Sequence, residues 1–316
     1  MNLSFSNLLD QLPGALAQGM IWGILAIGVY ITYKVLDMAD LTVDGSFCTG
    51  GAVLAVLLVQ GWGLWPALAL AVLAGALAGL VTGIFHVLFG ISPLLAGILT
   101  QIGLWAVNLS VMGKPNLALN VNHFRLLVSL RYLQEVIKGE RAFHGSPLFV
   151  AALFLLALIA LLYWFFGTEF GTGIRATGAN ISMAKAQGIS TGFAKIAGLM
   201  LSNSLVALSG ALLTQYQGFA DINMGRGAII IGLAAVIIGE VLLSRVFRNF
   251  ALRLLSSSMG AVIYFAVIQS VLWLRLDPNY LKLLTAVVVA VFLALPHWKS
   301  RLAQLSAWRK GGGDHA

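Results

Sequence analysis

The chain has 316 residues, of which 59% are hydrophobic and only 9% are charged, with a mean hydropathy of +0.93. Soluble domains carry about 25% charged residues, so this chain has too few to cover a soluble surface. The net charge of +8 comes from side chains in polar segments between apolar stretches, which favours anionic lipid headgroups over nucleic acid. The single cysteine, Cys48, excludes an intrachain disulfide. The composition predicts an all-α integral membrane protein.

A membrane-spanning helix needs about 20 mostly apolar residues, and nine stretches of the chain approach that length. They cover residues 14–36, 46–60, 64–89, 91–112, 147–167, 193–216, 227–244, 254–275 and 280–296. The second stretch is short and glycine-rich, so it either spans fully or forms a re-entrant helix. The third carries small residues at a spacing of four, which predicts one helix face for close packing against a neighbour. These residues are Ala67, Ala71, Gly75, Gly79 and Gly83.

Two polar segments separate the apolar stretches. Residues 113–146 contain leucine and isoleucine at helical spacing from Leu126 to Ile137, which predicts an amphipathic helix that lies on the extracytoplasmic face of the membrane. Residues 168–192 are too polar to span a membrane, and their glycines predict a broken helix outside the bilayer. The basic residues of the short loops place 168–192 and the tail 297–316 in the cytoplasm.

An internal similarity joins the two halves. Residues 38–46 (MADLTVDGS) and 219–227 (FADINMGRG) both follow an apolar helix, share an Ala-Asp pair and are separated by 181 positions. The pattern predicts one transmembrane domain over 1–316, with repeat one at about 14–112 and an inverted repeat two at about 193–296, an arrangement that many transporters use. Chance similarity between two turns is the alternative. Asp40, Asp44 and Asp221 in these breaks either form a gate or cap the helices that follow, with Asp40 and Asp44 on the second helix and Asp221 on the seventh.

The fourth stretch carries a polar and aromatic stripe. Gln101 and Asn108 are seven positions apart and therefore share a helix face, with Trp105 between them. This stripe either lines a translocation path or packs in the core. The chain has no phosphate-binding loop, HExxH or GxSxG motif. We therefore expect no catalytic, cofactor-binding or metal site in this chain.

Three segments resemble the membrane permease subunits of bacterial ABC importers, in the class of the branched-chain amino acid and ribose permeases. Arg175-Ala176-Thr177-Gly178-Ala179-Asn180, followed by Ala184 and Gly188-Ile189, is similar to the cytoplasmic coupling loop of that class. LDMADLTVDGSF (36–47) and MGKPN (112–116) resemble its other signatures. The segment 36–47 differs from the Asn-Phe-Ala-His-Gly-like stretch of the branched-chain group. The likeness is to a subgroup of uncharacterised substrate, some of whose operons suggest aromatic amino acids as cargo.

The resemblance implies the transmembrane subunit of an ATP-driven importer in the bacterial inner membrane, carrying a small, amino acid-like solute. Its implied partners are a second permease copy, preferably identical, a cytoplasmic ATPase pair that holds ATP and Mg, and an extracytoplasmic binding protein. The implied coupling residues are Arg175, Gly178, Asn180, Met183, Ala184, Gln187 and Gly188. We expect Asn180 to cap a coupling helix that Gly178 and Gly188 bracket with bends.

A self-sufficient secondary transporter with inverted repeats is the alternative. Such carriers usually hold a buried carboxylate at a broken helix near the membrane midplane. Here we expect the acidic residues to lie near helix ends, which favours the importer.

Overall fold

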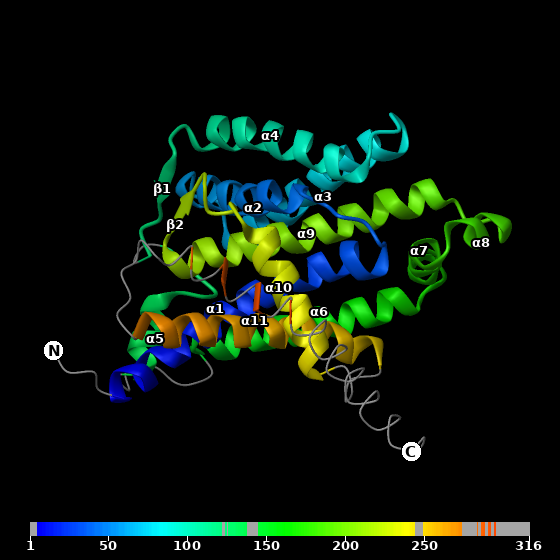
Figure 1. The fold of residues 1–316 in the computed structure, drawn as a ribbon. Helices are drawn as coiled ribbons and strands as arrows, with labels where there is room; N and C mark the ends of the chain where they lie inside the picture. Colours follow the sequence, from blue (N-terminus) through cyan, green and yellow to red (C-terminus); the bar gives the residue numbers. More distant parts are fainter. Residues whose placement is uncertain are drawn as a thin grey trace, which may run out of the picture.

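The structure is a computed structural model that describes residues 5–121, 124, 126–137, 145–243, 249–273 and single positions between 283 and 294. Apart from two short strands, the elements over these residues are helices (Figure 1). In chain order they are α1 (Phe5–Tyr30), η1 (Ile31–Val35), α2 (Thr42–Val59), α3 (Leu64–Val87), α4 (Pro93–Met112), β1 (Asn116–Ala118), α5 (Leu130–Ile137), α6 (Pro147–Gly167), α7 (Glu169–Ala179), α8 (Ile181–Ala186), α9 (Thr191–Gln217), β2 (Phe219–Asp221), α10 (Ala228–Leu243) and α11 (Phe250–Trp273).

Seven helices of the described residues are long and apolar enough to cross a membrane: α1 with η1, α2, α3, α4, α6, α9 and α11. α10 is apolar but has only 16 residues. The predicted ninth span, 280–296, and the tail 297–316 lie outside the described residues except for isolated positions. The all-α membrane class is confirmed, whereas the count of nine is not. α2 is one continuous helix of 18 residues, which supports the spanning alternative for the second stretch.

The core of the bundle forms around α9, which is buried along most of its length and packs against α1, α2 and α3. α3 contacts α9 through its small-residue face, with Gly75 against the backbone of Asn203 and Gly79 against that of Leu199. This contact confirms the predicted packing role of the small residues at a spacing of four. The absence of side-chain bulk lets two backbones approach and gain van der Waals contact that apolar lipid would not provide.

The bundle has two distinct ends (Figure 1). At one end, which we call the strand-pair end, β1 and β2 pair antiparallel with Leu117 opposite Ala220. At the other end lie α7 and α8. The strand pair was not predicted, and it ties the segment after α4 to the segment after α9.

α1 and α9 run in opposite directions. The Tyr216 hydroxyl near the end of α9 donates to the carbonyl of Gly14 near the start of α1, at 3.1 Å. Further along, the Ser202 hydroxyl donates to the carbonyl of Gly28 at 2.8 Å. Each of these helices leads into a non-helical break and then a further helix, α2 or α10. The two similar segments therefore follow helices of opposite direction, as an inverted repeat requires. The bounds of the two repeats stay a prediction.

The segment 113–146, which we predict to lie on the extracytoplasmic side, does contain a helix, but it begins at Leu130 rather than Leu126. Leu126 and Leu133 are buried, and Leu133 lies close to Gly14 of α1. Leu130, at the start of the helix, is 42% exposed, so only part of the apolar face packs against the bundle. The position of this helix on the membrane surface stays a prediction.

Candidate functional site

The two breaks of the internal similarity meet in space. Asp44, in the first turn of α2, accepts hydrogen bonds from the backbone N–H groups of Gly227 and Ile229, both at 2.9 Å. These N–H groups stand at the start of α10, where a helix has unpaired donors and a positive dipole end. Asp44 therefore caps α10 rather than its own helix, which corrects the predicted role. The cap joins the first half of the chain to the second.

Asp40 lies inside the bundle, with 2% of its surface exposed. Its carboxylate accepts from the Asn203 side-chain amide at 2.7 Å and from the backbone N–H of Thr42 at 2.9 Å. The contact with Thr42 confirms that Asp40 caps the start of α2. Asn203 lies near the middle of α9 and also accepts from the Ser46 hydroxyl at 2.6 Å. Asp40 thus lies at a helix end, as expected, but this end of α2 is inside the bundle rather than at its surface.

Asp221 has a different position from the other two acids. Its carboxylate accepts from the backbone N–H of Asn223 at 2.7 Å and from the Asn116 side-chain amide at 3.4 Å. It stabilises the turn that follows β2 and its contact with β1. The prediction that Asp221 caps the helix after it is wrong, because Asp44 occupies that position.

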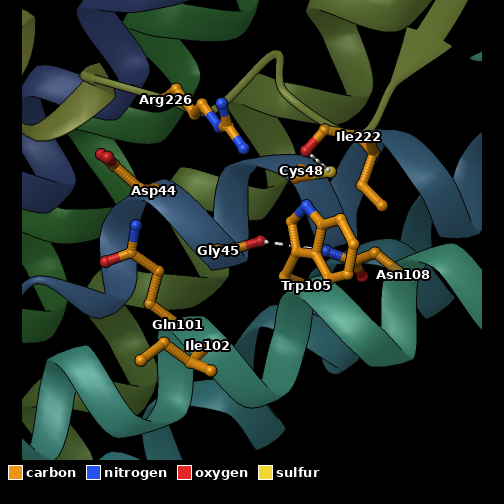
Figure 2. Close-up of a pocket in the computed structure, with 9 residues that line it drawn as sticks. All are labelled: Asp44, Gly45, Cys48, Gln101, Ile102, Trp105, Asn108, Ile222 and Arg226. Atoms are coloured by element: carbon orange, nitrogen blue, oxygen red, sulfur yellow. Dashed lines mark hydrogen bonds between the residues drawn. The ribbon is translucent and has the colours of Figure 1, made fainter. Parts of the chain in front are cut away.

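A cavity of about 300 Å³ lies where α2, α4 and the segment between β2 and α10 meet (Figure 2). We call it the central cavity. Its lining residues are Asp44, Gly45, Cys48, Gln101, Ile102, Trp105, Asn108, Ile222 and Arg226. Asp40 and Asp221 do not line it. The predicted stripe of Gln101, Trp105 and Asn108 thus reaches a cavity together with Asp44.

The polar groups of the central cavity differ in how they are held. Asn108 is buried and its amide donates to the carbonyl of Gly45 at 3.5 Å, while the Cys48 thiol donates to the carbonyl of Ile222 at 3.4 Å. Figure 2 shows the Arg226 guanidinium and the Trp105 indole extending into the same space. Trp105 is 46% exposed. The Trp105 side chain is therefore not packed in the core.

Arg226 was missed by the sequence analysis. Arg226 aligns with Gly45 when the two similar segments are compared. A positive charge in one copy and not in the other is the feature of the sequence that could have marked Arg226 as functional. Arg226 makes no ion pair within the described part of the chain. A guanidinium presents several donors in a fixed fork that matches a carboxylate. The cavity can thus offer a cation, amide groups and an aromatic face to a small polar solute.

The predicted coupling segment forms two short helices, α7 and α8. They are separated at Asn180, whose side chain accepts from the backbone N–H of Met183 at 3.0 Å. The predicted cap is therefore confirmed, although the break falls at asparagine rather than at a glycine. Gly188 follows α8 with φ of +79°, which confirms a bend at that position, because this backbone conformation favours glycine.

Three other predicted coupling residues face inward or sideways. Gly178 is no bend: it lies within α7 and packs against the backbone of Val35. Ala184 is 0% exposed, so its methyl group already has neighbours within this chain. The Arg175 guanidinium lies over the Phe250 ring, 4.9 Å from its centroid.

The remaining candidates lie on the outward face of α8 and at the residue that follows it. Met183 is 49% exposed, and Gln187 is also exposed. Ile181, at the start of the same helix, is a further exposed apolar side chain. A partner at this end of the bundle would meet these side chains first.

Comparison with known proteins identifies the family. A family model described as "Branched-chain amino acid transport system / permease component" matches residues 12–299. The tyrosine transport system permease protein of Clostridioides difficile is 39% identical over 292 residues, which cover 92% of this chain and 93% of the relative. The galactofuranose transporter permease protein YtfT of Escherichia coli is 27% identical over 273 residues, 85% of this chain and 74% of the relative.

A further match is the probable branched-chain amino acid transport permease protein LivH of Methanocaldococcus jannaschii, 28% identical over 239 residues, 72% of this chain and 73% of the relative. No solved structure matches the chain. With seven membrane-length helices among its described residues, it is a multi-pass protein of the bacterial inner membrane, and as a permease component it is not an enzyme. The chain belongs to the family of branched-chain amino acid transport system permeases, the membrane components of ABC transporters.

Proposed function

We propose that this chain is the transmembrane subunit of an ATP-driven importer and that the central cavity forms part of its path for an amino acid-like solute. The family implies association with ATPase and binding-protein subunits. The observation that carries the proposal is the position of the cavity, where Asp44 of the first similar segment caps the helix that follows the second. A site between inverted repeats is where alternating access places a solute.

The chemistry of the central cavity favours an amino acid over a sugar. Arg226 offers a guanidinium that matches a carboxylate, and Trp105 offers a flat apolar surface to a side chain. A sugar would use the aromatic face and the amides but would leave the guanidinium unmatched. The relative named for tyrosine transport supports an amino acid, while the relative named for galactofuranose shows that the family also includes sugar carriers.

The partners follow from the two ends of the bundle. We assign α8 to the cytoplasmic ATPase pair, which would hold ATP and Mg. We assign the strand-pair end to the binding protein. A second copy of the chain would complete the path as a homodimer, surrounded by membrane lipid. The exposed apolar residues of α4, such as Leu95 and Ile102, provide a face that either the second copy or lipid would cover.

The alternative function is a self-sufficient secondary transporter, and Asp40 favours it. A buried carboxylate at a break in the middle of a helix bundle is where proton-coupled carriers place their titrating group. However, Asp40 is hydrogen-bonded to Asn203 and Thr42 and does not line the central cavity. The family favours the ATP-driven function.

The path proposal predicts the effect of two cavity substitutions. Arg226→Gln should raise the KM for tyrosine uptake about 10- to 100-fold, because a hydrogen bond to a charged group contributes about 1.5–3 kcal/mol. Gln101→Leu should raise KM by about tenfold or less, because a neutral hydrogen bond is lost. Uptake of radiolabelled tyrosine into vesicles that contain the whole transporter measures both effects.

The matched control is Lys114→Gln, which removes one positive charge at the strand-pair end, outside the central cavity. Its KM should equal that of the unmodified protein. If Arg226→Gln and Gln101→Leu also leave KM unchanged at equal protein levels, the cavity is not on the path.

A further inference from the structure

A second polar site lies at the α7–α8 end of the bundle, apart from the central cavity. A cavity of about 570 Å³ there is lined by residues of α1, η1, α7 and α11, among them Tyr30, Lys34, Arg175 and Arg253. A neighbouring cavity of about 300 Å³ shares Tyr30, Lys34 and Arg253 and adds Glu240 of α10. We call the two together the basic cleft. It shares no lining residue with the central cavity.

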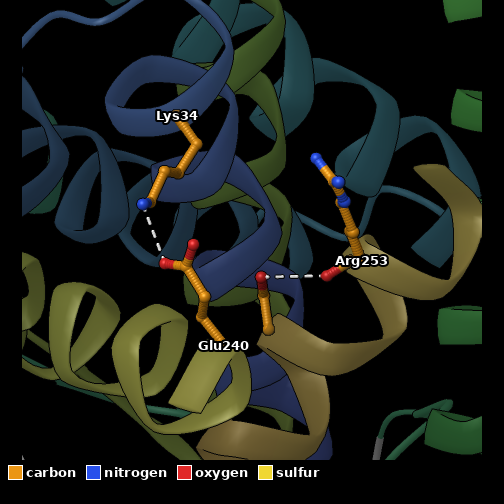
Figure 3. A network of polar contacts seen from close by, with 4 residues as sticks. Lys34, Glu240 and Arg253 are labelled. Atoms are coloured by element: carbon orange, nitrogen blue, oxygen red, sulfur yellow. Dashed lines mark hydrogen bonds and ion pairs between the residues drawn. The ribbon is translucent and has the colours of Figure 1, made fainter. Parts of the chain in front are cut away.

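The positive charges of the basic cleft exceed the negative ones. Lys34 forms an ion pair with Glu240 at 2.8 Å between Nζ and Oε2 (Figure 3). In the same view the Arg253 side chain extends away from the Glu240 carboxylate. The lining residues of the two cavities therefore include three cations and one acid, which leaves an excess of two positive charges.

The two guanidinium groups are held in place by aromatic neighbours rather than by acids. Arg175 of α7 lies over the ring of Phe250, and Arg253 of α11 lies beside the Tyr30 hydroxyl. The position over a ring face leaves the N–H groups of Arg175 available to an anion, and Arg253 has more N–H donors than the Tyr30 hydroxyl can accept. Because α7 and α11 each supply one arginine, an anion between them would be held from two sides.

The orientation of the chain alone does not explain this arrangement. Basic residues that only set orientation need to lie on one side of the membrane, not to line one cavity. Lys185, on α8 at the same end, is exposed and lines neither cavity of the cleft. Guanidinium pairs match the oxygen atoms of phosphate, and basic pockets between membrane helices bind phosphate-bearing headgroups.

We propose that the basic cleft binds a phosphoryl group, carried by the headgroup of an anionic lipid or present as free phosphate. Arg175 and Arg253 contact its oxygens, and Lys34 supplies further positive charge in exchange with Glu240. A bound phosphoryl group links α7, which continues into α8, to α11. The site thus stabilises the end of the bundle that we assign to the ATPase.

The test is the thermal unfolding of the full-length protein in nanodiscs. In phosphatidylcholine discs, addition of phosphatidylglycerol should raise the unfolding midpoint by about 2–4 °C if the ligand is a lipid headgroup. Titration of inorganic phosphate into phosphatidylcholine discs should give that increase instead if the ligand is free phosphate. The double variant Arg175→Gln/Arg253→Gln should lose whichever response is found.

The control is Lys114→Gln, which removes a positive charge at the opposite end and should keep the full response. Native mass spectrometry gives a second readout, since the double variant should retain less phosphatidylglycerol than the control. The proposal is overturned if neither ligand shifts the midpoint, or if the double variant and the control respond equally. It is also overturned if the double variant loses only the ATPase while its response to phosphatidylglycerol is unchanged, because the cleft would then be a protein-docking surface.

Discussion

Replacement of Met183 with arginine should abolish ATP-driven uptake while the protein still inserts and folds. Met183 is an exposed apolar side chain on α8, and a partner that packs against it would have to bury the new charge. Central contacts of an interface contribute about 2–4 kcal/mol, so the ATPase should bind roughly 30- to 1000-fold more weakly. Folding should be nearly unchanged, because substitutions at exposed positions usually cost about 0.5 kcal/mol or less. Uptake into vesicles and co-purification of the ATPase measure the two effects.

The matched control for Met183→Arg is Ala118→Arg, which adds the same side chain to an exposed position of the strand-pair end. It should retain the ATPase at the normal level. Ala184→Arg does not serve this test, because Ala184 is buried and an arginine there would disturb the contacts of α8 with its own chain. Normal uptake with normal ATPase retention in Met183→Arg would remove α8 from the coupling surface.

Replacement of Gly210 with leucine should prevent accumulation of folded protein. Gly210 on α9 packs against the carbonyl of Phe47 on α2, and Gly50 on α2 packs in the same way against Ala207 on α9. A Cβ atom at Gly210 would overlap backbone, which cannot move aside as a flexible side chain can. Overpacking usually costs about 1–3 kcal/mol, and here we expect the upper end or more because the two helices must separate.

Gly103→Leu is the control for that substitution. Gly103 lies within α4, and a Cβ atom there would meet no other atom within 4 Å. The yield of monodisperse protein in size-exclusion chromatography measures the difference. We expect a yield near normal for Gly103→Leu and almost none for Gly210→Leu. Similar yields of the two variants would show that the close approach of α2 and α9 does not support the fold.

Local patterns predicted the parts of the site that depend on one helix. The spacing of Gln101, Trp105 and Asn108 places them on one face of α4, and that face lines the central cavity. Asn180 caps α8 because capping is a contact within three residues of sequence. The small-residue face of α3 was also visible from spacing alone.

The parts that the sequence did not reveal depend on contacts between distant segments. Asp40 reaches the middle of the bundle because Asn203, 163 positions away, receives it there. Asp44 caps α10 through backbone groups more than 180 positions away, a pairing that no local pattern carries. β1 and β2 have three residues each, too few to show an alternating pattern. The inward position of Ala184 depends on how α8 packs against its neighbours.

The most direct test of the central claim is tyrosine uptake into proteoliposomes that contain the chain with its ATPase partner and binding protein. Our account predicts that uptake requires ATP inside the vesicles and persists when proton and sodium gradients are collapsed. It also predicts that Asp40→Asn, which keeps the size and one acceptor of Asp40, retains much of the ATP-driven uptake. Uptake by this chain alone, driven by an ion gradient without ATP and abolished by Asp40→Asn, would contradict the account and establish a self-sufficient carrier.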